Sequence, residues 1–200
     1  MSERALRATQ SRMSADAAPA SRPFSSLQPA ELDALFETAL RSADGRIGAH
    51  CIHELSMRGT MGVVIDRLLE RLWAAAADRI PDWLPTIHVE WLPIAYEIAG
   101  RFQASRRGRT NVYLILLDYA DSHRGPHGVY VGISRHAPAE RFEQHKLGIR
   151  SAGSVLRRGL EPLLGPTGHL QGIARAQAQA IEEPLAEALR SAGVIVKGGH

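Results

Sequence analysis

The chain has 200 residues, of which 44% are hydrophobic, and a formal net charge of +3 at pH 7. This length and composition suit one domain, or one domain with a helical appendage, and can fill a core. No run approaches the roughly 18 to 20 apolar residues that span a bilayer, and the N-terminus lacks an apolar secretion segment. Because the single Cys51 also excludes an intramolecular disulfide framework, we expect a cytoplasmic protein without membrane insertion.

The charge is divided unevenly between the two halves of the chain. Residues 1–100 carry 10 Lys and Arg against 13 Asp and Glu, whereas residues 101–200 carry 14 against 8. The net charges are therefore −3 and +6, which together give the +3 of the whole chain. A basic second half can bind a polyanion such as a nucleic acid, although it can also serve solubility alone.

The first half is expected to be mainly helical. Residues 1–28 are rich in Ala, Ser and Arg and predict a disordered tail. Pro29 opens a helical pattern that Gly45 is expected to stop, and a second pattern runs from Met61 to about Ala77. The prolines and tryptophans of residues 81–93 indicate a loop, and a short helix near residues 94–102 follows. The basic stretch "ASRRGRT" ends this N-terminal helical region, which we place at residues 29–109.

The second half, residues 110–200, alternates strand and helix signals. "NVYLILLDY" (111–119) predicts a strand buried on both faces, and "VYVGIS" (129–134) predicts its partner in a hairpin. A helix is expected from Pro138 to Leu147, with Gly148 at its end. A short helix within residues 151–165 and a longer helical stretch, kinked or divided by Pro184, precede a final strand at "VIVK" (194–197).

Five residues of this second half form an ordered set. "NVY" at 111–113 is followed by "YVG" at 130–132, by Arg141 nine residues beyond Gly132, by His145, and by Glu182 on the later helix. No single piece is specific, but the set in this order resembles the GIY-YIG nuclease superfamily over residues 111–199. The resemblance implies a mixed α/β (α+β) fold in which helices flank a small antiparallel three-stranded sheet. It also implies a metal-dependent endonuclease that acts on DNA, with RNA as a further possibility, and uses Mg²⁺ or Mn²⁺.

Two features depart from the family pattern. Asn111 and Val112 stand where the first signature has Gly and Ile, although Tyr113 is kept. The asparagine that many members carry after the glutamate is missing, and Val194 occupies its approximate place. These departures favour a rival hypothesis, in which the chain is a nucleic-acid-binding module that kept the fold and lost activity. A third hypothesis is a structural or partner-binding protein whose N-terminal helices form a homodimer interface.

The resemblance gives each of these residues a role that suits phosphodiester hydrolysis. Glu182 would hold one Mg²⁺, which commonly takes few protein carboxylates and completes its shell with waters and phosphate oxygens. Arg141 would donate to phosphate oxygens as negative charge builds, and His145, four residues later on the same helix face, would orient the phosphate or relay a proton. One of Tyr113 and Tyr130 would take the proton of the attacking water.

Each assignment has a simpler structural alternative. The two tyrosines suit a packed strand, Arg141 and His145 an exposed helix face, and Glu182 a surface carboxylate. Glu183 is an alternative metal ligand if Pro184 shifts the helix phase. Four cations are candidate contacts to the nucleic-acid backbone or simply solvated charges: Lys146, Arg150, Arg157 and Arg158.

Two groups of histidines suggest a zinc site only superficially. His123, His127 and His136 gather near the hairpin, but their spacing is irregular and no cysteine is near. "HCIH" at residues 50–53 has too few suitably spaced ligands, and a half-buried helix face explains it better.

Overall fold

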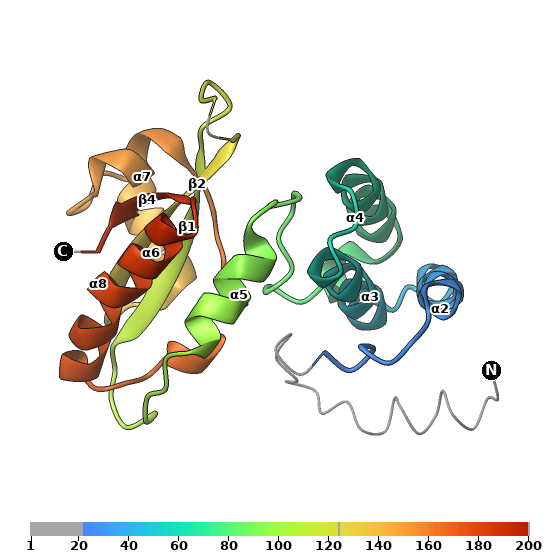
Figure 1. Ribbon diagram of the computed structural model, residues 1–200, viewed down its shortest axis with the longest axis horizontal. Coiled ribbons are helices and arrows are strands. Elements are labelled where there is room, and N and C mark those ends of the chain that lie inside the picture. Colours follow the sequence, from blue (N-terminus) through green and yellow to red (C-terminus); the bar gives the residue numbers. More distant parts are fainter. Residues whose placement is uncertain (1–21, 124, 200) are drawn as a thin grey trace. The chain divides into compact units, whose positions relative to one another are not determined.

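The computed structural model describes residues 22–123 and 125–199 and is drawn in Figure 1. The chain divides between His88 and Val89 into two compact units. We call the part before this boundary the helical unit and the part after it the sheet unit. Most of the expected disordered tail, residues 1–21, lies outside the described residues.

Three helices build the core of the helical unit: α2 (Pro29–Arg41), α3 (Gly45–Met57) and α4 (Gly62–Ala76), which a single-turn 3₁₀ helix (Ala77–Arg79) follows. The start of α2 agrees with the sequence, with Pro29 in its first turn and the Glu31 carboxylate accepting from the Gln28 amide at 2.9 Å. The end of α2 does not depend on Gly45. Instead, the Asp44 carboxylate accepts from the Ile47 amide at 3.0 Å and starts α3, with Gly45 as its first residue.

Residues 22–28 belong to the helical unit and not to a tail. Phe24 is buried in the core of the three helices. Nearby, the buried Glu54 carboxylate accepts from Arg22 at 2.7 and 3.0 Å and from Arg58 at 2.7 Å. Arg58 also donates to the carbonyl oxygens of residues 24, 25 and 27. An apolar anchor and a neutralised carboxylate therefore hold this segment in place.

A four-stranded sheet forms the centre of the sheet unit, so the protein is mixed α/β as predicted. Its strands are β1 (Asn111–Asp118), β2 (His127–Ser134), β3 (Gly159–Pro162) and β4 (Ile195–Gly198), in the order β3-β1-β2-β4. The expected three-stranded antiparallel sheet is wrong in two respects. The strand β3 was not predicted, and β4 pairs with β2 in parallel. Parallel pairing is open to β4 because the long helical connection from β2 returns the chain in the same direction.

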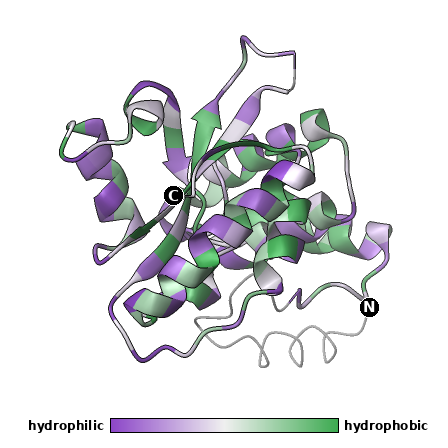
Figure 2. Ribbon diagram, turned by 60° about the vertical axis from the view of Figure 1, so that its left-hand side comes forward, coloured by the Kyte–Doolittle hydropathy of each residue, from purple (hydrophilic) through white to green (hydrophobic). Residues whose placement is uncertain are grey.

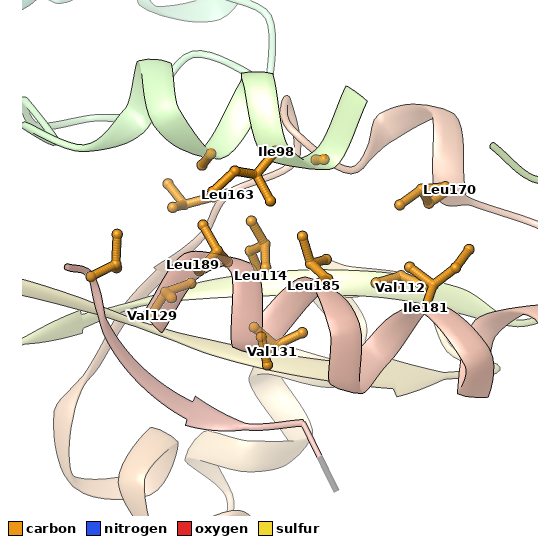
Figure 3. Close-up of a cluster of buried hydrophobic side chains, with 14 of the residues drawn as sticks. Ile98, Val112, Leu114, Val129, Val131, Leu163, Leu170, Ile181, Leu185 and Leu189 are labelled. Carbon is orange, nitrogen blue, oxygen red and sulfur yellow. The ribbon is translucent and has the colours of Figure 1, made fainter. Parts of the chain in front are cut away.

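The helices α5 (Leu92–Gly100) and α8 (Arg175–Ser191) cover one face of this sheet. Figure 3 shows their side chains meeting those of the two central strands, with Ile98 of α5 and Leu185 and Leu189 of α8 opposite Leu114 and Val131. The short helix expected near residues 94–102 is assigned by its sequence to the N-terminal helical region, whereas these contacts place α5 with the sheet. Leu170 of the 3₁₀ helix Gly168–Leu170 packs in the same cluster.

The opposite face of the sheet carries α6 (Pro138–Lys146) and α7 (Gly153–Arg158). Their residues Phe142 and Val155 pack on Tyr113, Ile115 and Leu117, which alternate with the residues facing α8. The helix α6 begins at Pro138, and Gly148 follows its end with a φ of 77°, as the sequence predicts. The mixture of hydrophobic and hydrophilic residues along the helices can be followed in Figure 2.

The helix α8 continues through Pro184 as one helix, so the expected division into two helices is wrong. Pro184 itself is exposed, while Ile181, Leu185 and Leu189 on the sheet-facing side are buried. Burial of this apolar face offsets the hydrogen bond that the proline removes. No described helix has both the length and the apolar character needed to cross a membrane.

Candidate active site

The register of the hairpin brings the two signature tyrosines together. Tyr113 of β1 pairs with Gly132, and Tyr130 of β2 pairs with Ile115. The two tyrosines are therefore diagonal neighbours on the α6 face of the sheet, and their ring centroids lie 6.0 Å apart.

Gly132 leaves the space that the Tyr113 ring occupies. A Cβ atom at this position would lie 2.7 Å from the Tyr113 hydroxyl and 2.7 Å from Cε1 of Tyr130. Side chains do not approach a Cβ so closely, so any larger residue would push the tyrosines apart. The glycine of "YVG" thus has a structural reason at the site itself.

His145 of α6 fixes the Tyr113 hydroxyl. Its side chain is buried, with 1% exposed, and its Nδ1 accepts from the Ala152 amide at 3.1 Å. Because a backbone amide can only donate, Nδ1 carries no proton and the neutral ring holds its proton on Nε2. That Nε2–H donates to the Tyr113 oxygen at 3.1 Å, which leaves the Tyr113 O–H free to donate elsewhere.

Burial and the neighbouring Arg141 charge lower the pKa of His145 to about 4. The imidazole is therefore neutral at pH 7, in agreement with its hydrogen bond from the Ala152 amide. In this state His145 donates a hydrogen bond to Tyr113 and carries no positive charge.

The two tyrosines differ in exposure and in electrostatic surroundings. Tyr113 is only 2% exposed, and burial, assisted by Tyr130, raises the pKa of its hydroxyl, while Arg141 opposes the rise. Tyr130 is half-buried. Burial also raises the pKa of Tyr130, but hydrogen bonding by Tyr113 lowers it, the Glu182 charge raises it, and the Arg141 charge lowers it. Tyr130 is thus the tyrosine whose ionisation responds to both predicted charged groups.

Arg141 holds the loop that follows α6. Its guanidinium donates to the side-chain oxygen of Gln144 at 3.1 Å and to the carbonyl oxygens of Ile149 and Arg150 at 3.0 and 2.7 Å. These bonds use only part of its fan of N–H donors, and its charge acts on Tyr113, Tyr130 and His145. Arg141 therefore lies at the site, fixed in place before any substrate arrives.

Glu182 comes from the opposite side of the sheet unit, on α8. It is 9% exposed, and its charge reaches Tyr130. Glu183 is exposed on the same helix, whereas Glu182 is buried. The pKa of Tyr130 is therefore influenced by Tyr113, Arg141 and Glu182. The fifth predicted group, the His145 ring, lies 5.7 Å from the Tyr130 ring.

The donor set suits a metal that needs few protein ligands. Within residues 22–123 and 125–199, no group of three or more His, Cys, Asp or Glu side chains is placed to bind a metal ion. His127 bonds to Glu90 at 2.8 Å and His136 to Glu140 at 2.7 Å, while His50 and His53 are buried against Trp83. A single carboxylate at Glu182 fits Mg²⁺ or Mn²⁺, which can take their remaining ligands from water and substrate phosphate.

The four predicted phosphate-contact cations do not behave alike. Arg158 pairs with Asp121 at 2.9 Å and lies over the Tyr119 ring, and Lys146 donates to the Gly159 carbonyl at 3.2 Å. The side chains of Arg150 and Arg157 are exposed and make no hydrogen bond or ion pair with any described residue. Arg150 and Arg157 are thus the two of this set that are free to meet a phosphate.

Asn111 has a role that the sequence did not reveal. Its amide donates to the His136 carbonyl at 2.9 Å and accepts from the Gly172 amide at 2.8 Å. It therefore ties the loops before α6 and α8 to the start of β1. The departure from glycine at the first signature position supplies this tether, and only the folded structure shows both partners.

Comparisons with protein-family models, with curated proteins and with solved structures gave no match to this chain. The resemblance to the GIY-YIG superfamily therefore depends on the sequence residues quoted above alone.

Proposed function

We propose that this protein is a GIY-YIG-type endonuclease that hydrolyses phosphodiester bonds in DNA with the help of Mg²⁺ or Mn²⁺. One observation carries the proposal: the half-buried Tyr130 ring lies 6.0 Å from the Tyr113 ring and 5.7 Å from the His145 ring, and the charges of Arg141 and Glu182 act on its hydroxyl. A tyrosine that only packed the sheet would not need a cation and a carboxylate in its surroundings.

The direction of the hydrogen bonds favours Tyr130 as the group that takes the proton of the attacking water. His145 donates to Tyr113, so the Tyr113 proton points away from His145 and can stabilise an anion on Tyr130. An ordinary tyrosine at pH 7 is ionised in only about one molecule in a thousand, and burial lowers that fraction further. Positive charge from Arg141 and from a metal at Glu182 is what would make the phenolate accessible.

The remaining groups would stabilise charge on the phosphate. A metal ion bound at Glu182 would supply positive charge to the phosphate oxygens and the leaving group. The Arg141 N–H donors that are not bonded to the loop carbonyls would donate to the same phosphate. Because those carbonyls already hold the guanidinium, it loses little freedom on binding.

The setting proposed for this activity is the cytoplasm, with DNA as substrate and RNA as the alternative polyanion. The residues from 101 onward carry the net charge of +6, and Arg150 and Arg157 are exposed beside the site helices. Cys51 is buried and burial raises the pKa of its thiol to about 12, so it stays a thiol in a reducing compartment. The proposal also includes a homodimer formed through the N-terminal region.

A plasmid assay tests the proposed activity. Supercoiled plasmid is incubated with the purified protein in Mg²⁺ or in EDTA, beside the Glu182→Ala and Arg141→Ala variants. We expect nicking that needs Mg²⁺ and is lost in both variants, by a factor of about a hundred or more. Tyr130→Phe should be as inactive as these variants and Tyr113→Phe less so, and the reverse order would move the base to Tyr113.

The same assay separates the rival functions. Binding of DNA at low salt without cleavage by the wild-type protein supports the inactive binding module, which the high pKa of both tyrosines and the absent family asparagine favour. Neither binding nor cleavage leaves the structural or partner-binding protein as the remaining hypothesis.

A further inference from the structure

A pocket lies beside the sheet, away from the tyrosines. It has a volume of about 330 Å³ and is lined by Thr110, Ile133, Ser134, Arg135 and Arg175. This volume is at the lower end of the range of about 300–1,000 Å³ that small-ligand sites occupy. The residues that line it include two arginines and no carboxylate, so its charge suits an anion.

Three of the four polar side chains that line this pocket make no hydrogen bond or ion pair with described residues. Thr110 is only 5% exposed, yet in the described chain its hydroxyl makes no hydrogen bond. Arg135 and Arg175 are exposed and form no ion pair or hydrogen bond with residues that the structure describes. Ser134 accepts from the His136 amide at 3.1 Å, which leaves its own O–H available to donate. The Thr110 hydroxyl oxygen keeps some solvent access within a nearly buried residue, so it can donate to a ligand in the pocket.

The start of α8 borders the same pocket through Arg175. The N-cap residue is Ala174, which has no side chain to accept from the first-turn amides, and Arg175 follows as the first helical residue. Alanine is a poor N-cap, and a cation at this end opposes the helix dipole. The helix terminus thus has neither a capping side chain nor a favourable charge. A bound anion would accept from the first-turn amides and neutralise the cation.

We propose that Thr110, Ser134, Arg135, Arg175 and the first-turn amides of α8 form a phosphate subsite for the nucleic-acid strand. The inference depends on the proposed function, since it identifies how that substrate is held. Ser134 lies four residues beyond Tyr130 on the same face of β2, which is about 13 Å. Arg175 lies seven residues before Glu182, which is about 10 Å along α8. At about 3.4 Å of duplex axis per nucleotide, the subsite holds a phosphate some three or four nucleotides from the reacting one.

The subsite is tested by binding to a fluorescein-labelled DNA duplex in EDTA, where no cleavage occurs. Fluorescence anisotropy is measured over a range of salt for the wild type, for the double variant Arg135→Gln/Arg175→Gln, and for Thr110→Val. The control Arg41→Gln/Arg101→Gln removes the same charge from exposed positions outside the pocket. We expect the pocket variant to bind about tenfold more weakly and its salt slope to fall by about one, with a smaller loss for Thr110→Val and little change in the control.

Cleavage in Mg²⁺ at saturating DNA separates the subsite from the active site. At limiting DNA the double variant should cleave about tenfold more slowly than wild type and should recover most of this loss at saturating DNA, whereas the control Arg41→Gln/Arg101→Gln should cleave like wild type throughout. If wild type cleaves DNA but the pocket and control variants bind alike, the subsite is wrong and the nuclease stands. If wild type binds through these arginines but does not cleave, the subsite stands and the nuclease is wrong. If wild type does not bind DNA at all, both are overturned.

Discussion

The direction of one hydrogen bond distinguishes the two tyrosines of the candidate site. His145 receives the Ala152 amide on Nδ1 and so must donate from Nε2 to Tyr113. Tyr113 is therefore buried with its hydroxyl oxygen bonded to His145, and Tyr130 is the tyrosine with partial exposure. The two signature tyrosines thus differ in burial and in hydrogen bonding, a difference that the sequence motif does not suggest.

The lowered pKa of His145 predicts a loss of stability in mild acid. The folded pKa is about 4 and the ordinary value is 6.5, so below pH 6.5 the unfolded chain binds the proton more readily. The contribution of neutral His145 is therefore complete above pH 6.5 and is lost as the pH falls towards 4. Urea midpoints should fall over this window in wild type and fall less in His145→Gln.

His50 also lowers the stability of the fold in mild acid, and it is present in both the wild type and the His145→Gln variant. Burial, with Arg46, lowers the pKa of His50 to about 4 as well, so the variant should retain part of the acid sensitivity. Parallel curves of urea midpoint against pH for wild type and His145→Gln would contradict a neutral, buried His145.

Gly132→Ala tests the close approach of the tyrosine rings to β2. The added Cβ would meet Tyr113 and Tyr130 at 2.7 Å, so we expect a destabilisation of about 1–3 kcal/mol and a large loss of cleavage. Gly168→Ala is the control, because a Cβ there meets nothing within 4 Å. Thermal unfolding and plasmid nicking measure both variants, and equal behaviour of the two would mean that Gly132 is not needed for space.

At the scale of elements, the signals that predicted well were local. The apolar run of β1, the alternation of β2 and the Pro138 and Gly148 boundaries of α6 each need only neighbouring residues. The sequence placed Tyr113, Tyr130, Arg141, His145 and Glu182 through a resemblance, and the fold gathers them around Tyr130. No local sequence pattern indicates that Arg135 and Arg175 line the same pocket, because forty residues separate them.

The elements that sequence reasoning missed depend on distant partners. Four residues with Gly159 at one end and Pro162 at the other lack the alternation of a strand, and β3 exists because β1 offers it an edge. Gly45 looked like a helix stop, but the Asp44 side chain makes it a helix start. Pro184 looked like a break, yet the buried face of α8 holds the helix together. In each case tertiary burial or a side-chain cap overrides intrinsic propensity.

Changing the N-cap of α8 separates helix stability from anion binding. Ala174→Asn and Ala174→Asp both supply a side-chain acceptor for the first-turn amides, so each should stabilise the protein by about 1 kcal/mol. The aspartate also brings negative charge to the pocket of Arg135 and Arg175, so it should weaken DNA binding more than the asparagine. Thermal unfolding and DNA anisotropy check both effects. Equal DNA affinities for the two variants would show that no phosphate lies at this terminus.

For the whole molecule, the two units differ in how their charged side chains are paired. The sheet unit keeps Arg135, Arg150 and Arg175 unpaired, while the helical unit buries Glu54 between two arginines. Burial favours the neutral acid at Glu54, but hydrogen bonds from Arg22 and Arg58 outweigh it and lower its pKa. The Glu54 cluster therefore stabilises the helical unit, whereas Arg135, Arg150 and Arg175 of the sheet unit are available to a ligand.

Glu54→Gln should weaken the helical unit. Loss of the charge weakens the hydrogen bonds from Arg22 and Arg58, with an expected cost of about 1–3 kcal/mol in urea unfolding. Glu37→Gln is the matched control, because Glu37 pairs with Arg71 on the surface and should matter far less. A cost for Glu37→Gln as large as that for Glu54→Gln would show that the Glu54 cluster adds nothing beyond an ordinary surface pair.

The most direct test of the proposed nuclease compares two neighbouring carboxylates on α8. Glu182 is nearly buried and acts on Tyr130, whereas Glu183 is exposed. The measurement is the single-turnover rate of DNA cleavage as a function of Mg²⁺ concentration for wild type, Glu182→Gln and Glu183→Gln. We predict Mg²⁺-dependent cleavage in wild type and in Glu183→Gln, and a rate at least about a hundredfold lower in Glu182→Gln at every Mg²⁺ concentration. Equal rates for the two variants, or no Mg²⁺-dependent cleavage by wild type, would contradict the proposed function.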